Sequence, residues 1–425
     1  MSADLRILVV SPVPSHPPNQ GNAARILAFG RELQLRGAAL DYLYYGMEGL
    51  TNDQRTAMSA FWHRFFFLAS SPNKRPSHAS RWGIDDWCPE ELCNTVKELA
   101  RTHRYDAIVV NYVWMSRVLV DLDIPCKVID THDLFSDRHK MLEENDLDPR
   151  WFFTSVDEER KGFARADVVI GIQDNEAARI RSMQEAGQGE GHAVGQRAQV
   201  VTVGHIIAPH FLLGYRKAEA FFQFGYLGSA NPWNVRSVRA LDAALMAETR
   251  EPLGWALAGT ICRRELHLKS GPYKMGLVDT LADFYRNVDC VINPMIGGTG
   301  LKIKTVEALS FGNPVIGTLD AFEGMPANHA LHALATVDDM LEAMKDYRSI
   351  PALRAEVLRA SRELYFHYMA DVSQQYDALA ALLRKGDAGA AADRLAAGRH
   401  ALGQIAPEAQ PVVRARNRMV RSDPA

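Results

Sequence analysis

The sequence predicts an α/β protein with two domains, each built on a parallel β-sheet. Apolar runs of strand length alternate with helical patterns along most of the chain, as parallel strands require, because each return to the same sheet edge needs a long crossover. The chain has 425 residues, which is longer than one hydrophobic core usually grows. A Gly-rich loop at residues 297–300 separates a strand from a helix, an arrangement that carries ligands in open α/β sheets.

The first domain is expected over residues 1–207. An apolar strand at residues 6–10 leads into a loop rich in Pro and Gly, which excludes regular structure. A helix with periodic apolar positions follows at residues 23–36 and ends at Gly37. An aromatic segment at residues 61–67 is expected to pack in the core, with an exposed patch for a lipid-linked ligand as the alternative. A further helix is expected at 89–102, and further strands at 40–45, 107–110, 127–130, 168–172 and 199–203.

The second domain is expected over residues 208–370, after an irregular linker that contains Pro209. Its predicted strands lie at residues 222–227, 255–258, 290–292 and 315–317, and its predicted helices at 235–248, 277–286, 301–311, 336–347 and 351–384. The last of these helices is expected to break near residues 368–371. Residues 371–385 are expected to form a crossover helix that returns to the first domain, followed by an Ala- and Arg-rich tail at 386–425.

Composition excludes several classes of protein. A formal net charge of -3 with 23% charged residues argues against a nucleic-acid binder held by bulk electrostatics. No apolar run reaches the roughly 20 residues that span a bilayer, and the first residues do not resemble a signal peptide. The five scattered cysteines indicate reduced thiols in the cytoplasm. Cys88 and Cys93 lack a second pair at zinc-ligand spacing, so no metal site is expected.

The helix that opens at Leu301 carries charged residues suited to an anionic ligand. Lys302 and Lys304 follow the Gly-rich loop directly, where a helix N-terminus and lysines together favour a diphosphate. The alternative is a solvated helix face. Glu307 shares a face with Lys304, so it could accept hydrogen bonds from sugar hydroxyls, or instead form a weak ion pair with Lys304.

Five segments taken in order resemble the GT-B glycosyltransferases, most closely the bacterial retaining group often called glycosyltransferase family 4. They are VIDTHDLFSDR (128–138), TSVDEERKGFARADVVIGIQDNEAARI (154–180), FGYLGSANPWNV (224–235), MGLVDTLADFYRNVDCVINP (275–294) and GTGLKIKTVEALSFGNPVIGT (298–318). The resemblance covers roughly residues 5–384. It implies two Rossmann-like domains facing a central cleft, with a nucleotide-sugar held by the C-terminal domain and the acceptor lying against the N-terminal domain.

The same resemblance assigns roles to residues on both sides of the cleft. Lys302 and Lys304 would bind the diphosphate and Glu307 the ribose. The other residues implied for donor binding are Gly228, Ser229, Asn234, Gly276, Leu277, Val278, Gly298, Thr299, Gly300 and Leu301. In the N-terminal half, Gly21 would pack against the donor sugar, His132 and Asp133 would act in catalysis, Glu176 would face the cleft, and Tyr112 and Ser116 would line the acceptor side.

Two alternatives concern individual residues. His132 could instead be a core or capping histidine, and His16 in the first loop is the rival base of an inverting mechanism. One departure from the family pattern is Thr299, which stands eight residues before Glu307, where many retaining members carry a glutamate that contacts the donor sugar. Backbone amides of residues 297–300 would then take over that contact.

The predicted function is transfer of a hexose from a nucleotide-diphosphate sugar to a hydroxyl of a glycan or glycolipid, with retention. No Asp-x-Asp stands at a strand end in the donor half, which favours a metal-independent site without a cofactor. The alternatives are a nucleotide-sugar 2-epimerase and a non-catalytic sugar-nucleotide-binding protein of the same fold. The protein is expected in the cytoplasm, with a possible peripheral membrane contact through its basic tail.

Overall fold

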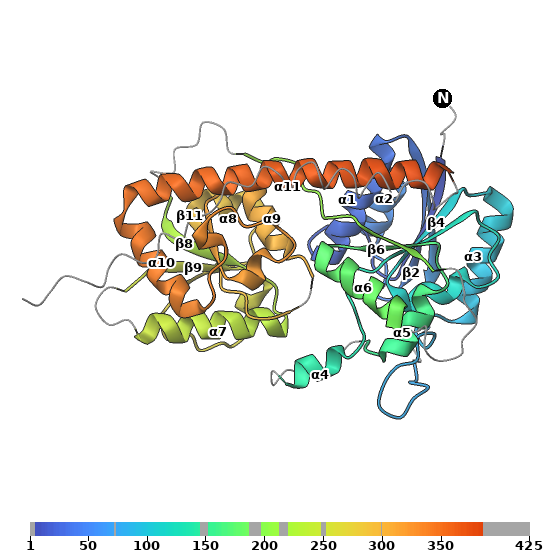
Figure 1. The fold of residues 1–425 in the computed structure, drawn as a ribbon, viewed down its shortest axis with the longest axis horizontal. Coiled ribbons are helices and arrows are strands. Elements are labelled where there is room, and N and C mark those ends of the chain that lie inside the picture. Colours follow the sequence, from blue (N-terminus) through green and yellow to red (C-terminus); the bar gives the residue numbers. More distant parts are fainter. Residues whose placement is uncertain are drawn as a thin grey trace, which may run out of the picture. The chain divides into compact units, whose positions relative to one another are not determined.

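Two β-sheets, in which every strand runs parallel to its neighbours, form the framework of the protein (Figure 1). The computed structural model describes residues 5–71, 74–144, 152–186, 197–211, 220–247, 252–298 and 300–385. Within these residues the first sheet has seven strands in the order β3-β2-β1-β4-β5-β6-β7, and the second has five in the order β10-β9-β8-β11-β12. The predicted α/β class with two parallel sheets is confirmed.

The strands of the first sheet are β1 (Leu5–Ser11), β2 (Ala38–Gly46), β3 (Arg64–Ala69), β4 (Ala107–Asn111), β5 (Cys126–Asp130), β6 (Val168–Gly171) and β7 (Gln199–Thr202). Those of the second are β8 (Phe222–Leu227), β9 (Trp255–Ala258), β10 (Tyr273–Gly276), β11 (Val288–Asn293) and β12 (Val315–Gly317). The α-helices are α1 (Gly21–Leu35), α2 (Asn52–Phe61), α3 (Glu90–His103), α4 (Arg138–Glu143), α5 (Val156–Phe163), α6 (Asp174–Ala186), α7 (Pro232–Ala247), α8 (Leu281–Asn287), α9 (Ile303–Ser310), α10 (Val337–Ser349) and α11 (Pro351–Lys385). Short 3-10 helices lie at η1 (Val113–Leu119), η4 (Thr260–Arg263), η5 (Leu319–Phe322) and η6 (Ala330–His332).

The aromatic segment at residues 61–67 forms the end of α2 and the start of the edge strand β3. Trp62 is 3% exposed, and its ring stacks on Tyr42 of β2 at 4.5 Å between centroids. Phe65 and Phe67 are half-buried. The segment therefore packs against the sheet, and the exposed lipid-facing patch is not what the structure shows.

A buried ion pair connects helix α1 to the middle of the first sheet. Arg25 of α1 donates to both carboxylate oxygens of Asp130 at the end of β5, at 3.0 and 3.2 Å, and both side chains are 1% exposed. A third guanidinium hydrogen bond runs to the carbonyl oxygen of Gly204, just after β7, at 2.6 Å. These hydrogen bonds hold together α1, the end of β5 and the segment after β7. They persist because a buried guanidinium that loses its partners is strongly destabilising.

Helix α11, the long red helix of Figure 1, is unbroken from Pro351 to Lys385. The predicted break near residues 368–371 is wrong. Pro351 suits the first helical position, and no Gly or Pro follows within the helix, so nothing in the backbone interrupts it. Tyr368, at the expected break, is buried, and its hydroxyl accepts from the backbone N–H of His205 and donates to that residue's carbonyl oxygen, both at 3.0 Å.

Helix α11 contacts elements from both halves of the chain. It packs on α9, α10 and β12, and also on α1. Near its C-terminal end, Asp377 accepts from Arg36 at 2.7 Å. The described residues up to Lys385 belong to one compact unit. The predicted boundaries at 207 and 370 remain predictions, and the predicted tail at 386–425 lies outside the described residues.

Strand order determines where each sheet offers a ligand site. In the first sheet β1 lies between β2 and β4, and in the second β8 lies between β9 and β11, so the chain changes direction across the sheet at both places. Loops that follow two such strands diverge and leave room beyond their carboxyl ends. The predicted donor residues lie after β8 and β11 and at the end of β10. The predicted catalytic residues follow β1 and β5, and the predicted acceptor-side residues follow β4.

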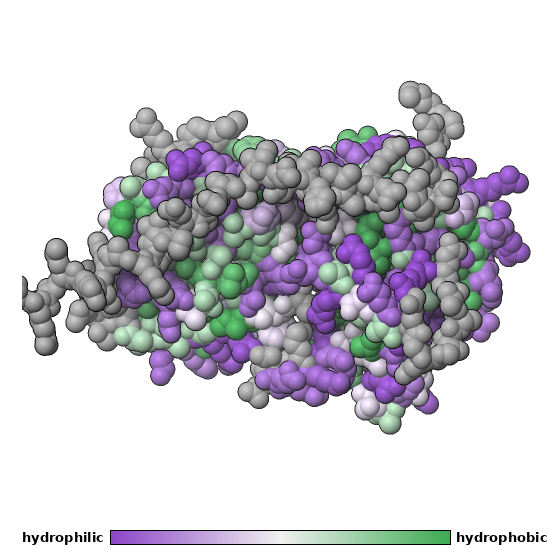
Figure 2. All heavy atoms as spheres, viewed as in Figure 1, coloured by the Kyte–Doolittle hydropathy of each residue, from purple (hydrophilic) through white to green (hydrophobic). Residues whose placement is uncertain are grey.

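Hydrophilic residues predominate on the face shown in Figure 2, with hydrophobic patches scattered between them. Among the helices of the described ranges, none combines the length and the apolar character needed to cross a membrane.

We expect Asp130→Asn to destabilise the protein by about 3–5 kcal/mol, because the change leaves the Arg25 charge buried without its counter-ion. Urea denaturation followed by circular dichroism measures this loss. The matched control is Asp377→Asn, whose carboxylate pairs with Arg36 but is 68% exposed, so its loss should cost less than about 1 kcal/mol. Equal effects of the two substitutions would contradict the importance given to the buried pair.

Candidate active site

The loop between β11 and α9 owes its shape to glycines. Gly297, Gly298 and Gly300 have φ angles of +74°, +85° and +73°, a region that residues with a Cβ rarely adopt. The backbone N–H of Gly297 donates to Asp320 of η5 at 2.6 Å. Thr299 lies outside the described residues, so the expected contact of its backbone stays a prediction. The loop brings backbone close to the start of α9, as an anion site requires.

Lys302 is the N-cap residue of α9 and is 6% exposed. Its ammonium group donates to the carbonyl oxygen of Gly300 at 2.7 Å and pairs with Glu323 at 3.1 Å. The alternative of a solvated helix face does not describe this lysine. Its charge is held at the loop, and in the described structure an internal carboxylate neutralises it.

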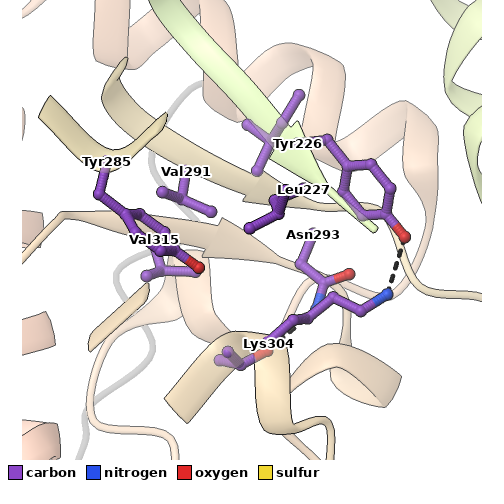
Figure 3. Close-up of a pocket in the computed structure, with 9 residues that line it drawn as sticks. Tyr226, Leu227, Tyr285, Val291, Asn293, Lys304 and Val315 are labelled. Atoms are coloured by element: carbon purple, nitrogen blue, oxygen red, sulfur yellow. Dashed lines mark hydrogen bonds between the residues drawn. The ribbon is translucent and has the colours of Figure 1, made fainter. Parts of the chain in front are cut away.

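Lys304 lies in the first turn of α9, and its side chain lines a small pocket at the carboxyl end of β8 (Figure 3). Its ammonium group donates to the hydroxyl of Tyr226 at 2.7 Å and to the side-chain oxygen of Asn234. Asn234 in turn donates to the hydroxyl of Ser229 at 3.1 Å, in the loop after β8. Burial, assisted by the charge of Lys302, lowers the pKa of Lys304 to about 7. Three predicted donor residues are thus joined in one hydrogen-bonded chain.

Glu307 lies one turn further along α9 and accepts a hydrogen bond from the hydroxyl of Tyr285 at 2.7 Å. Burial raises the pKa of Glu307 to about 7, against the smaller opposing effects of that hydrogen bond and of Lys304. In the described ranges, Glu307 and Lys304 form no direct ion pair. The site therefore contains a lysine and a carboxyl group that both titrate near neutral pH.

The remaining predicted donor residues lie at the ends of the neighbouring strands. The N–H of Gly228 donates to the carbonyl of Ala258 at 3.0 Å, and the carbonyl of Gly276 accepts from Gly259 at 2.8 Å. Leu277 is 52% exposed, as an apolar wall for a ligand would be, and Val278 is half-buried. Leu301 is 8% exposed, and a Cβ placed on Gly324 would lie 3.2 Å from its side chain. Within the described residues, no hydrogen bond joins Gly276, Leu277 or Val278 to the Lys304 cluster, which consists of Lys304, Tyr226, Asn234 and Ser229.

His132 follows β5 in a left-handed conformation, with φ of +59°. Its Nε2 lies 2.6 Å from the side-chain oxygen of Asn111, and its ring stacks on Tyr112 at 4.4 Å. An amide oxygen only accepts, so Nε2 carries the proton and Nδ1 is left as an acceptor. Burial lowers the pKa of His132 to about 4, so the ring is neutral at physiological pH.

The carboxylate beside His132 is that of Asp130, at 3.7 Å from Nε2, and not that of its chain neighbour Asp133. The side chain of Asp133 turns instead to Arg138, at 2.8 Å, and accepts from the N–H of Leu134 at 3.1 Å. The left-handed backbone at His132 separates the two neighbouring side chains, because it turns the chain sharply after the strand.

The other predicted N-terminal residues differ in their surroundings. Gly21 begins α1, and a Cβ there would lie 3.3 Å from Ile303, so the first loop meets the start of α9. His16 lies with Nδ1 3.0 Å from the hydroxyl of Ser15, and burial lowers its pKa. Ser116 is fully buried and accepts from Arg165 at 3.1 Å, which is the environment of a core hydroxyl and not of an acceptor groove.

Several polar residues of the site escaped prediction from the sequence. Tyr226 and Tyr285 contact Lys304 and Glu307, and Gln173 donates to Glu323 at 3.1 Å, so the turn between β6 and α6 reaches the carboxylate that pairs with Lys302. Tyr226 is the second-last residue of a strand, which is the only sequence signal that could have suggested it. The partners come together through the fold and not through local spacing.

Comparison with known proteins agrees with this geometry. The sequence model of the family described as glycosyl transferases group 1 matches residues 222–347, which contain β8 to β12 and the whole Lys304 cluster. No curated protein matches the sequence. The residues that follow β8 and β11 therefore lie within the stretch that matches this family model.

Solved structures resemble nearly the whole chain. Sucrose-phosphate synthase from Thermosynechococcus elongatus is 16% identical, with a TM-score of 0.62, over 90% of this chain and 100% of that one. Anabaena HepE, solved with UDP and glucose, is 14% identical, with a TM-score of 0.58, over 88% and 98%. TarM is 10% identical, with a TM-score of 0.61, over 88% and 98%. The chain shares the fold of these proteins, which is the GT-B fold.

We expect Gly297→Ala to disturb the loop without unfolding the protein. The new Cβ would lie 2.6 Å from the ring of Trp233 and would occupy a positive φ, which together should cost about 2–4 kcal/mol. Gly254→Ala is the control, because a Cβ there meets nothing within 4 Å. Thermal melting compares the two variants, and an equally small shift for both would show that the loop is not tightly packed.

Proposed function

We propose that the protein transfers a hexosyl group from a nucleoside-diphosphate sugar to a hydroxyl group of a glycan or glycolipid acceptor, with retention of the anomeric configuration. The observation that carries this proposal is the cluster of Lys302, Lys304 and Glu307 beside the glycine loop, inside a domain that matches group 1 glycosyl transferases. UDP is the nucleotide that we favour, because structures of a relative in fold contain UDP and UDP-glucose.

The donor half offers the groups that a departing diphosphate needs. The N-terminus of α9, the glycine loop and two lysines supply positive charge and hydrogen-bond donors where negative charge develops during transfer. The two lysines can carry this role without a metal ion, which is why we propose metal-independent transfer. Glu307 and the exposed face of Leu277 are the proposed contacts for ribose and base.

The N-terminal half contributes a histidine, His132, that can accept a hydrogen bond or a proton. In the neutral His132 ring Nδ1 is unprotonated, so it can accept from a sugar hydroxyl, while Asn111 and Tyr112 hold the ring in place. We propose this contact for His132, and we assign Gly21 to close packing against the donor, because it lies against the start of α9. His16 would serve as base only if the reaction inverted the anomeric centre.

The direct test measures binding of UDP-sugars by calorimetry and then transfer to glycan or glycolipid acceptors. Lys302→Ala and Glu307→Ala should each weaken binding of the preferred UDP-sugar about tenfold or more, because a charge-assisted hydrogen bond contributes roughly 1.5–3 kcal/mol. Lys345→Ala on α10, which pairs with Glu342 away from the loop, is the control and should bind as the wild type does. Binding that survives in all three variants would refute the site, and an inverted product by NMR would refute retention.

We expect affinity for a UDP-sugar to fall as pH rises from about 6 to about 9. Lys304, with a pKa of about 7, loses its proton over this range in the empty protein, and a bound diphosphate restores it, so binding takes up a proton. When binding takes up one proton, the affinity falls by at most about tenfold for each unit that the pH rises. Glu307 also has a pKa of about 7, and its ionised carboxylate would repel the diphosphate, which also lowers the affinity as pH rises.

Two variants separate these contributions. Lys304→Met should bind more weakly and with a flatter pH profile, and Glu307→Gln should remove only the part that comes from the carboxyl group. The diphosphate of a UDP-sugar is a diester whose charge is constant over this range, so the diphosphate does not add its own titration. A flat profile in the wild type would mean that Lys304 stays charged throughout.

A further inference from the structure

One buried carboxyl oxygen near the glycine loop has no partner within the described residues. Glu176 lies in the first turn of α6 and is 4% exposed. Its Oε1 lies 2.6 Å from the hydroxyl of Thr131, whereas Oε2 is buried and makes no hydrogen bond. A buried polar atom without a partner is costly, so its presence calls for a ligand or another functional reason.

This oxygen faces the glycine loop. A Cβ placed on Gly300 would lie 3.8 Å from Oε2 and 3.8 Å from Ile172, which precedes α6. The carbonyl oxygen of Gly300 is occupied by the ammonium group of Lys302. The β6–α6 turn thus contributes an acceptor oxygen to the space over the glycine loop, next to the lysine proposed for the diphosphate.

Hydrogen-bond counting fixes what Oε2 can do. The hydroxyl of Thr131 has one proton but lies within bonding distance of two acceptors, the carbonyl of Ile170 at 2.8 Å and Glu176 Oε1 at 2.6 Å. If that proton goes to Ile170, the carboxyl group must be protonated on Oε1 and must donate to Thr131. Burial raises the pKa of Glu176 to about 8, with the charge of Asp133 as the next cause, which agrees with this assignment.

Oε2 is an acceptor when the carboxyl group is ionised and also when it is protonated on Oε1, the state in which it donates to Thr131. It suits the hydroxyl of a sugar, which can donate, and it does not suit a diphosphate, which has no proton to offer at neutral pH. The two parts of a nucleotide-sugar therefore have separate places on the loop, the diphosphate at the lysines and the hexose toward α6.

We propose that Glu176 binds the transferred hexose, accepting a hydrogen bond from one of its hydroxyl groups through Oε2, and so selects donors that carry this hydroxyl. This inference rests on the proposed use of a nucleotide-sugar. It gives the N-terminal half a direct part in choosing the donor sugar, and it places a carboxyl group over the loop from outside the donor domain.

The test compares binding and turnover of UDP and of the preferred UDP-hexose by the wild type, Glu176→Gln and Glu176→Ala. Glu176→Ala should keep UDP affinity within about twofold and lower kcat/KM for the UDP-hexose about tenfold or more, the effect of one hydrogen bond to a buried carboxyl group. Glu176→Gln should have a kcat/KM between those of the wild type and Glu176→Ala, because its amide can donate to Thr131 and still present an oxygen to the sugar. Glu185→Gln, on the exposed surface of the same helix, is the matched control and should equal the wild type.

A series of monodeoxy UDP-hexoses separates contact from structural support. Removing the hydroxyl that donates to Glu176 should lower kcat/KM of the wild type but should not lower kcat/KM of Glu176→Ala any further. The other deoxy donors should lower kcat/KM of both proteins alike. Thermal melting of Glu176→Gln should match the wild type, since the amide mimics the protonated acid.

The possible failures are distinct. If the wild type binds neither UDP nor any UDP-hexose, the proposed function fails, and this inference falls with it. If the wild type turns over a UDP-hexose and Glu176→Ala does so equally well, only the inference is overturned. Loss of UDP affinity in Glu176→Ala, or equal losses for every deoxy donor in both proteins, would also overturn it, because Glu176 would then act through the loop and not on the sugar.

Discussion

The buried ion pair between Arg25 and Asp130 is the constraint on which the N-terminal side of the site depends. It fixes α1 against the end of β5 and reaches Gly204 beyond β7. Because Asp130 is the last residue of β5, its position determines where the next two residues stand. Thr131 then meets Glu176, and His132 meets Asn111. A charge that is costly to bury is thus used to orient the neutral groups of the site.

Burial has opposite effects on the two kinds of titratable group at the donor loop. It lowers the pKa of Lys304 and raises that of Glu307, so that both reach about 7. A site with few fixed charges can accept or release protons as its ligand changes. The tyrosines that contact these groups are neutral, and their hydroxyls hold each side chain in one orientation in both charge states.

Much of the fold could be predicted from local patterns, because buried parallel strands are continuous apolar runs. The strands at 222–227, 255–258 and 315–317 have the predicted bounds. The strands β3 and β10 were missed because they lie at sheet edges, where consecutive aromatic or mixed residues show no clear period. Side-chain partners such as Tyr226 with Lys304, 78 residues apart, depend on tertiary contacts that no local pattern contains.

Lys302 illustrates how the protein compensates for a buried positive charge. Glu323 supplies a resident counter-ion, and its second oxygen accepts from Gln173 of the β6–α6 turn. An incoming diphosphate must compete with this carboxylate, so a single weak anion such as free phosphate gains little by binding there. When the carboxylate yields, Gln173 loses its partner as well. A change of anion at Lys302 therefore reaches the β6–α6 turn as well as the glycine loop.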